Sequence, residues 1–371
     1  MRVLILSCNT GGGHNACADA MHHAFTEWGH RCDIADALQF VSDKLSKIVA
    51  WGHTAIYRHV PGLMRVGYDF AEKHPELLHD DAAVYKLLTG GTEQLHDLIL
   101  QGNYDTVVCA HIFAGLLLGK MQKEYPTPLK TALVATDYTC SPGTANSELD
   151  CYFIPAASLM GEFVTQGVPE DRIVPSGIPV QKGFYEPADK QKAKAALGIS
   201  PEHSHLLMMC GSMGCGPLEK LTRLLSQGMD ETMELSIVCG TNEKLYAELT
   251  EAFKDCRNIR IHGFVKDMVA MMDSADLCLT KPGGLSTTEA AAKRLPMVFV
   301  DTVAGCEEYN LQYFTALGGA VTADTPEELA QLCLELMRSE SRRMQMVTAL
   351  ETLSRQNAAE CICRTMCTNG Q

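Results

Sequence analysis

The sequence predicts an α/β protein in two similar halves, each with a parallel sheet flanked by helices. In the first half, the apolar segment Val3–Ser7 leads into the loop Gly11–Gly13 and then into His14. The second half repeats this arrangement where Leu206–Cys210 leads into Gly211–Gly214. A strand that enters a helix through such a loop presents backbone N–H groups that bind anionic groups. We therefore expect two Rossmann-like domains that face each other across a cleft.

The composition is that of a soluble globular protein, with 46% hydrophobic and 20% charged residues in a chain long enough for two domains. The formal net charge of −14 argues against a nucleic-acid partner, because phosphate contacts need clustered Lys and Arg. It does not exclude a nucleotide, since backbone amides bind phosphates without a basic patch.

Several features indicate a cytoplasmic location. The apolar run Val3–Leu6 is too short for a signal peptide, and no window approaches the roughly 18 apolar residues of a membrane span. The sixteen cysteines lack the spacing of a disulfide framework and are expected to be reduced. Cys361, Cys363 and Cys367 have no second ligand pair at metal-site spacing, so we expect small buried apolar side chains there and no metal.

Strand and helix patterns alternate along residues 1–180, which predicts a parallel sheet with helices on both faces. The expected strands are Val3–Ser7, Arg31–Ala35, Thr106–Ala110, Thr131–Ala135, Tyr152–Pro155 and Ile173–Pro175. The turn-rich segment Ser176–Val180 then places a domain boundary near residue 180. In residues 181–371 the expected strands are Leu206–Cys210, Glu234–Cys239, Ile259–His262, Leu277–Thr280, Met297–Val300 and Ala320–Thr322, followed by C-terminal helices.

Residues 38–90 interrupt this alternation with aromatic and aliphatic side chains among basic ones, and no strand is obvious there. A stretch of this length between strands is usually functional. One interpretation is a pair of helices packed on the first domain. The other is an amphipathic insert that contacts a lipid or the inner face of the cell membrane.

The first glycine loop has two functional interpretations. With Asp33 or Asp36 about 20 residues on, Gly11–Gly13 approximates a dinucleotide fingerprint and would fit an NAD oxidoreductase. The second glycine loop, Gly211–Gly214, speaks against that activity. His14 stands at a helix N-terminus, where the dipole disfavours a protonated imidazole, so it can act as a general base on a substrate hydroxyl. A structural His that caps the helix is the alternative.

The most specific run comes late in the chain. It contains Gly263-Phe264-Val265, Lys281-Pro282-Gly283-Gly284-Leu285-Ser286, Glu289 and Gly305-Cys306-Glu307-Glu308-Tyr309-Asn310. With the opening Ser7-x-x-x-Gly11-Gly12-Gly13-His14 and the run Ala135-Thr136-Asp137-Tyr138, it resembles the glycosyltransferase family of monogalactosyldiacylglycerol synthase and the processive diacylglycerol glucosyltransferases. The peptidoglycan N-acetylglucosaminyl transferase is a more distant relative. The resemblance covers nearly the whole chain.

The resemblance implies a GT-B type fold like that of glycosyltransferase family 28. Residues 1–180 would bind the acceptor, with the loop Gly11, Gly12 and Gly13 on the acceptor side, and residues 181–371 would bind a UDP-sugar donor. The donor-binding residues that it implies are Gly211, Ser212, Met213, Gly214, Gly263, Phe264, Val265, Gly283, Gly284, Leu285, Ser286, Glu289, Glu307 and Asn310.

The same resemblance suggests roles for individual side chains. Glu289 falls on the family's ribose-binding glutamate, although Ser286-x-x-Glu289 is also a possible capping box. Glu307 and Asn310 match the family's sugar-contacting Q-E-x-x-N, with Cys306 in place of the Gln. Asp137 ends an apolar strand and could orient an acceptor hydroxyl, or it could simply cap a turn.

No D-x-D motif occurs in the chain, so we expect backbone amides rather than a metal to stabilise the departing UDP, and no cofactor. The expected reaction is inverting transfer of a hexose to a hydroxyl acceptor, a lipid such as diacylglycerol, with His14 as base. An isomerase of the UDP-N-acetylglucosamine 2-epimerase type is one alternative. A non-catalytic nucleotide-sugar sensor is another.

Overall fold

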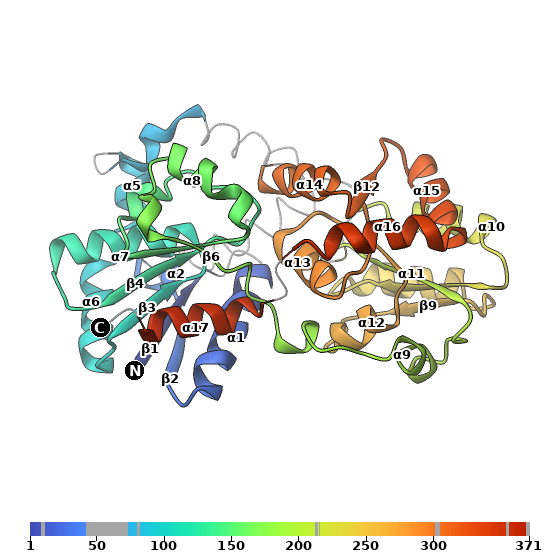
Figure 1. Ribbon diagram of the computed structural model, residues 1–371, viewed down its shortest axis with the longest axis horizontal. Coiled ribbons are helices and arrows are strands. Elements are labelled where there is room, and N and C mark those ends of the chain that lie inside the picture. Colours follow the sequence, from blue (N-terminus) through green and yellow to red (C-terminus); the bar gives the residue numbers. More distant parts are fainter. Residues whose placement is uncertain are drawn as a thin grey trace. The chain divides into compact units, whose positions relative to one another are not determined.

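The computed structural model describes residues 1–8, 12–41, 73–79, 82–211, 214, 216–300, 305–353 and 356–368 (Figure 1). The chain divides into two compact units. The first unit contains Met1–Lys182, Val303–Tyr309 and Gln356–Gln371, and the second contains Gly183–Thr302 and Asn310–Arg355.

The described first unit contains a six-stranded parallel sheet in the order β2-β1-β3-β4-β5-β6. Its strands are β1 (Arg2–Ser7), β2 (Arg31–Asp36), β3 (Thr106–Cys109), β4 (Lys130–Val134), β5 (Cys151–Ile154) and β6 (Ile173–Pro175). Its α-helices are α1 (Gly12–Glu27), α2 (Ala37–Val41), α5 (Ala83–Leu88), α6 (Thr92–Gly102), α7 (Ile112–Glu124), α8 (Met160–Thr165) and α17 (Ala358–Thr368). Strands buried on both faces need near-continuous apolar sequence, and β1, β3 and β5 supply it.

The described second unit also has a six-stranded parallel sheet, in the order β12-β11-β10-β7-β8-β9. Its strands are β7 (Ser204–Met209), β8 (Met233–Val238), β9 (Ile259–His262), β10 (Leu277–Thr280), β11 (Met297–Phe299) and β12 (Ala320–Thr322). Its α-helices are α9 (Lys190–Ala196), α10 (Leu218–Gly228), α11 (Glu243–Ala252), α12 (Met268–Ser274), α13 (Gly284–Ala292), α14 (Cys306–Leu317), α15 (Pro326–Arg338) and α16 (Glu340–Leu350); the first residues of α14 group with the first unit.

Each strand expected from the sequence is present within the described ranges, with ends that differ by a few residues at most. The α/β fold class is therefore confirmed. Most of the 38–90 segment lies outside the described residues, so its two interpretations stay predictions. Its described parts are the end of α2, the 3-10 turn η1 (Pro75–Leu78) and α5.

The last helix, α17, belongs to the first unit and packs along α1 (Figure 1). Its C-terminal end is fixed to the sheet because the Lys130 Nζ at the start of β4 donates to the Met366 carbonyl at 3.0 Å. Near its N-terminal end, a Cβ added at Gly177 would lie 3.4 Å from the Ala358 methyl group. The C-terminal helix therefore packs on the first unit.

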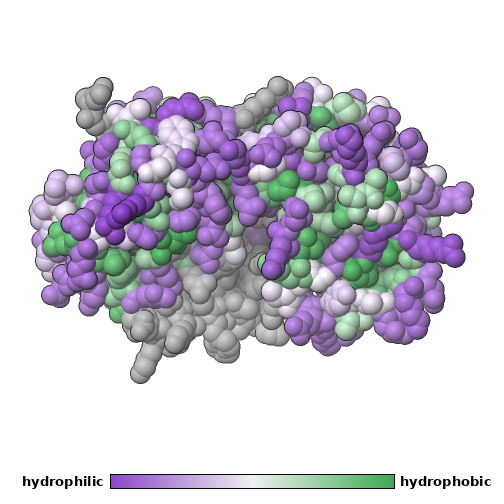
Figure 2. Space-filling view, turned by 90° about the horizontal axis from the view of Figure 1, so that it is seen from below, coloured by the Kyte–Doolittle hydropathy of each residue, from purple (hydrophilic) through white to green (hydrophobic). Residues whose placement is uncertain are grey.

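On the face shown in Figure 2, hydrophilic side chains predominate and apolar ones form small groups between them. This distribution agrees with the net charge of −14. None of the helices within the described ranges combines the length and the apolar character that a bilayer span requires.

Candidate active site

In the first unit, the strand order places a topological switch point between β1 and β3. The chain goes from β1 to β2 on one side and later adds β3 on the other side. Ligands of open α/β sheets bind outside the carboxyl ends of the strands at such a point. His14, in the first turn of α1, and His111, just after β3, meet there with ring centroids 4.5 Å apart.

The His14 ring is fixed by the ends of two strands. Its Nδ1 lies 3.0 Å from the Ala110 carbonyl oxygen, and the Thr136 hydroxyl is 3.2 Å from the same nitrogen. A carbonyl oxygen can only accept, so Nδ1 carries the ring proton and Nε2 keeps its lone pair. A half-buried imidazole in this tautomer is oriented as a general base requires.

His111 was not among the residues that the sequence singled out. It is the N-cap of α7, where its Nδ1 accepts a hydrogen bond from the Phe113 backbone N–H at 3.0 Å. In the neutral ring, the proton is therefore on Nε2. Its position in the sequence could have identified it, because His111 follows an apolar strand just as His14 does. Its cap geometry indicates a helix-stabilising residue whose ring also packs against His14.

Asp137 follows Thr136 directly and is half-buried. The Cys306 thiol donates to its carboxylate, and burial followed by the charges of Asp137 and Glu307 raises the pKa of that thiol well above its usual range. These three side chains therefore lie together, all within the first unit. The sequence had assigned Glu307 to the donor-binding half, whereas the structure groups the start of α14 with the half that carries His14.

In the second unit, the switch point lies between β7 and β10. Gly211 and Gly214 follow β7, and the segment Lys281–Ser286 follows β10. Both loops therefore leave the sheet at neighbouring carboxyl ends, as expected for a phosphate site. Ser212 and Met213, like Gly11 in the first unit, lie outside the described residues.

Gly214 can be nothing but glycine. Its φ is +56°, and an added Cβ would lie 2.1 Å from the backbone oxygen of Cys239 at the end of β8. Asn242, the N-cap of α11, holds this position by donating from Nδ2 to the Gly214 carbonyl at 3.1 Å. The backbone of Gly214 therefore packs directly against the end of β8, and a side chain would not fit between them.

Two glycine substitutions should separate the cost of a strained backbone from the cost of a steric clash. Gly211 has a φ of +67°, but no heavy atom of the described residues beyond its chain neighbours lies within 4 Å of its added Cβ. We expect Gly211→Ala to cost about 1–2 kcal/mol of unfolding free energy in urea. Gly214→Ala should cost more than about 3 kcal/mol, or fail to fold. Equal costs for the two would contradict this account of the loop.

The N-terminus of α13 is suited to an anionic group. Its N-cap is Gly283, and no described side chain caps it. Gly284, Leu285 and Ser286 occupy the first turn, whose N–H groups have no partner within the helix. The fully buried Asn310 donates from Nδ2 to the Pro282 carbonyl at 2.9 Å, which stabilises the loop before α13.

The capping-box interpretation of Ser286 and Glu289 is wrong. A capping box requires Ser286 at the N-cap, but the helix has already begun at Gly284. Glu289 instead lies in the second turn, where burial raises the pKa of its carboxyl group to about 8. A carboxyl group whose pKa is raised this far by burial is a candidate for a functional role.

The loop after β9 offers an aromatic surface. Phe264 leaves 62% of its surface exposed, and a Cβ on its neighbour Gly263 would reach only Tyr246, at 4.0 Å. Val265 is half-buried. The Nε2 of His262 is buried and has no hydrogen-bond partner in the part of the chain that the structure describes, and burial lowers the pKa of this ring. The exposed aromatic ring of Phe264 offers a face on which a nucleotide base can stack.

Two Rossmann-like units, with a histidine at the switch point of one and glycine-rich loops at the switch point of the other, are the arrangement of the GT-B class of glycosyltransferases. Family models support this class along most of the chain: residues 14–180 match monogalactosyldiacylglycerol (MGDG) synthase, and residues 205–362 match the glycosyltransferase family 28 C-terminal domain. A curated relative, the processive diacylglycerol β-glucosyltransferase of Staphylococcus carnosus, is 30% identical over 276 residues, or 74% of this chain and 70% of the relative.

The chain therefore belongs to the glycosyltransferase family that contains the monogalactosyldiacylglycerol synthases and the processive diacylglycerol β-glucosyltransferases. Solved structures agree on the fold. MurG of Acinetobacter baumannii superposes with a TM-score of 0.65 at 15% identity and covers 98% of this chain and 99% of its own. The UDP-GlcNAc 2-epimerase of Neisseria meningitidis, bound to UDP-GlcNAc, superposes with a TM-score of 0.62 at 13% identity and covers 100% of both chains.

Proposed function

We propose that this glycosyltransferase moves a hexose from a UDP-sugar, with inversion at the anomeric carbon, to a hydroxyl group of a diacylglycerol-type lipid. The observation that carries the proposal is the fixed tautomer of His14, whose Nδ1 donates to the Ala110 carbonyl and so leaves Nε2 as a base. An epimerase needs no base for an acceptor hydroxyl. The name of the curated relative supports the lipid acceptor and the glucosyl-type transfer.

In the proposed reaction, the acceptor hydroxyl gives its proton to His14 Nε2 while its oxygen bonds to the anomeric carbon. The bond between that carbon and the UDP oxygen breaks on the opposite face, and the electron pair leaves with UDP. The N–H groups in the first turn of α13 and the loop that contains Gly214 stabilise the added charge on the diphosphate. No step in this scheme requires a metal ion.

Individual residues extend the scheme. Glu289 accepts hydrogen bonds from the ribose hydroxyls, and the loop Gly263–Val265 faces uracil. Asp137 orients the acceptor hydroxyl, and Glu307 and Asn310 lie toward the sugar. On the acceptor side, α5 exposes Val84 and Leu87, which supports an apolar acceptor and peripheral contact with a membrane surface.

The test uses the full-length protein with UDP-glucose, UDP-galactose and UDP-N-acetylglucosamine, each with and without diacylglycerol vesicles. We expect UDP release only with lipid present, and a β-linked glycolipid by mass spectrometry and NMR. Adding EDTA together with the substrates should leave the initial rate unchanged, because the leaving group is held by backbone amides.

Two other outcomes would replace the proposal. Conversion of the UDP-sugar to its 2-epimer without acceptor would show that the protein is an isomerase. The Neisseria epimerase has a similar fold. Binding of UDP-sugar with neither product would establish a sensor. An initial rate that is lost in EDTA and restored by Mg²⁺ would contradict the metal-free leaving-group step alone.

A further inference from the structure

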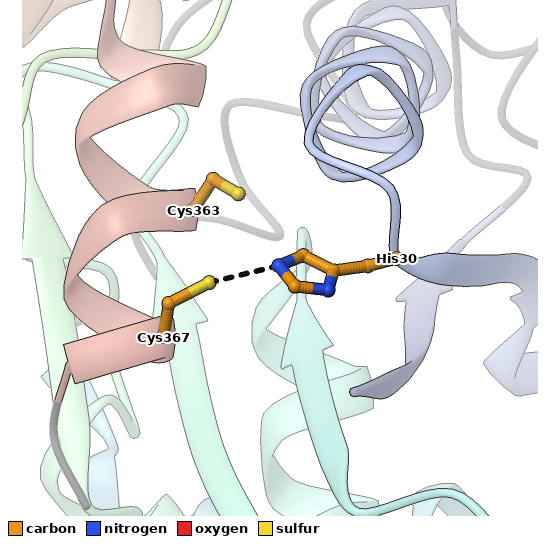
Figure 3. Close-up of side chains that lie close together, drawn as sticks. All are labelled: His30, Cys363 and Cys367. Atoms are coloured by element: carbon orange, nitrogen blue, oxygen red, sulfur yellow. Dashed lines mark hydrogen bonds between the residues drawn. The ribbon is translucent and has the colours of Figure 1, made fainter.

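A group of soft ligands lies at the opposite edge of the first sheet from His14. His30 ends the turn between α1 and β2, so it lies at the amino end of the strand. Figure 3 shows its ring pointing at Cys363 and Cys367 of α17. The Nε2 of His30 is 3.1 Å from the Cys367 Sγ, and one ligand atom from each of the three side chains lies within 4.8 Å of the other two.

The fold holds these side chains in place from both sides. Cys363 and Cys367 are four residues apart on α17, which puts them on one face of the helix. The α17 backbone is tied to β4 through Lys130. On the other side, Gly29 has a φ of +80°, and the His30 N–H donates to the Phe25 carbonyl, so α1 ends in a fixed turn.

The hydrogen-bond partners of His30 show where its ring proton lies. The Met1 ammonium group can only donate, so the His30 Nδ1 accepts in their 3.4 Å contact. The neutral ring then carries its proton on Nε2, the nitrogen that faces the Cys367 Sγ. A metal ion that binds here must therefore displace protons from its ligands.

We propose that His30, Cys363 and Cys367 bind one Zn²⁺ ion, which pins the C-terminal helix α17 to the sheet of the first unit. Thiolates and a neutral imidazole are the ligands that zinc prefers, at about 2.3 Å from sulfur and 2.0–2.1 Å from nitrogen. Ligand atoms within 4.8 Å of one another must approach to about 3.5–3.8 Å to share one tetrahedral zinc ion, with a water molecule as the fourth ligand. The spacing of the C-terminal cysteines in the sequence offers no second ligand pair. In the fold, His30 lies beside Cys363 and Cys367 as a third ligand.

The position of the site makes it structural rather than catalytic. His30 precedes β2, whereas His14 follows β1, and the two strands are parallel. The ligands thus lie at the amino edge of the sheet, and the candidate base lies at the carboxyl edge. Zinc binding should therefore raise the unfolding temperature without changing the initial rate of glycosyl transfer.

The experiment compares full-length wild-type protein with the double variant Cys363→Ser/Cys367→Ser and with Cys361→Ser, a matched control on the same helix. Each is loaded with ZnCl₂ under reducing conditions, passed through metal-free gel filtration and assayed for zinc by plasma mass spectrometry. We expect about one zinc per chain in the wild type and in Cys361→Ser, and none in the double variant. Zinc should raise the unfolding temperature of the first two proteins only.

A second measurement keeps the test independent of how well the double variant folds. Co²⁺ added to the wild type should give thiolate-to-metal charge-transfer absorption, and His30→Ala should weaken cobalt binding at least tenfold. Absence of this absorption in folded wild-type protein would overturn the proposal. Equal zinc in the wild type and the double variant would also overturn it. A third contrary result would be a Cys363–Cys367 disulfide, found by peptide mapping of protein purified under reducing conditions.

Discussion

Replacing His14 by Ala is expected to lower the turnover number by about 10²–10⁴-fold, because general-base catalysis contributes a factor of that size. The Nδ1 of this ring lies within hydrogen-bond distance of the Ala110 carbonyl and the Thr136 hydroxyl, which fixes the orientation of the imidazole. UDP affinity, measured by calorimetry, should change less than about twofold, since the glycine-rich loops proposed to hold the diphosphate belong to the second unit.

Two further variants separate the base from a merely structural histidine. His14→Asn retains an amide N–H at the position of Nδ1 that can donate to Ala110 but has no basic nitrogen, so it should be as inactive as His14→Ala. His23→Ala, an exposed histidine on the same helix, should keep full turnover. A loss of less than about tenfold in His14→Ala would make His14 structural and Asp137 the leading candidate. Loss of UDP binding would show that the first glycine loop contacts the donor.

The fold could be predicted because local sequence determines most of it. Strands such as Leu206–Met209 are buried on both faces of a parallel sheet, so they are continuous apolar runs that need no partner to be recognised. The loops were recognisable for a similar reason. Gly214 has a backbone conformation and a close neighbour that only glycine tolerates. Such a position must be glycine, so the loop can be recognised as a glycine-rich segment after an apolar strand.

The parts of the site that could not be predicted depend on strand order. His111 meets His14 because β1 and β3 are neighbours, although the two histidines are 97 positions apart in the sequence. The hydrogen bond between Cys306 and Asp137 likewise joins distant segments. The capping box was mistaken because Ser286-x-x-Glu289 fits the local pattern, while the helix began two residues earlier. Local patterns identify residue types, but only the tertiary structure selects their partners.

Replacing Glu289 by Ala is expected to weaken UDP binding by about 1.5–3 kcal/mol, or roughly 10–150-fold, the contribution of a charge-assisted hydrogen bond. The matched control is Glu335→Ala, an exposed glutamate on α15, which should bind UDP as the wild type does. Affinity is measured by calorimetry after circular dichroism has shown that each variant is folded. Unchanged affinity in folded Glu289→Ala would remove Glu289 from the donor site.

The pH dependence of UDP affinity tests the same residue more sharply. In the free protein, burial raises the pKa of Glu289 to about 8, so at pH 7 most of its carboxyl groups carry a proton. Ribose hydroxyls donate to the charged carboxylate, so binding must release that proton. Affinity should therefore be greatest above pH 8 and fall as the pH is lowered, by up to about tenfold per unit. Glu289→Gln, measured in parallel to account for titration of the nucleotide itself, should lack this dependence. If the wild type and Glu289→Gln respond identically to pH, then the buried carboxyl group does not exchange its proton for the nucleotide.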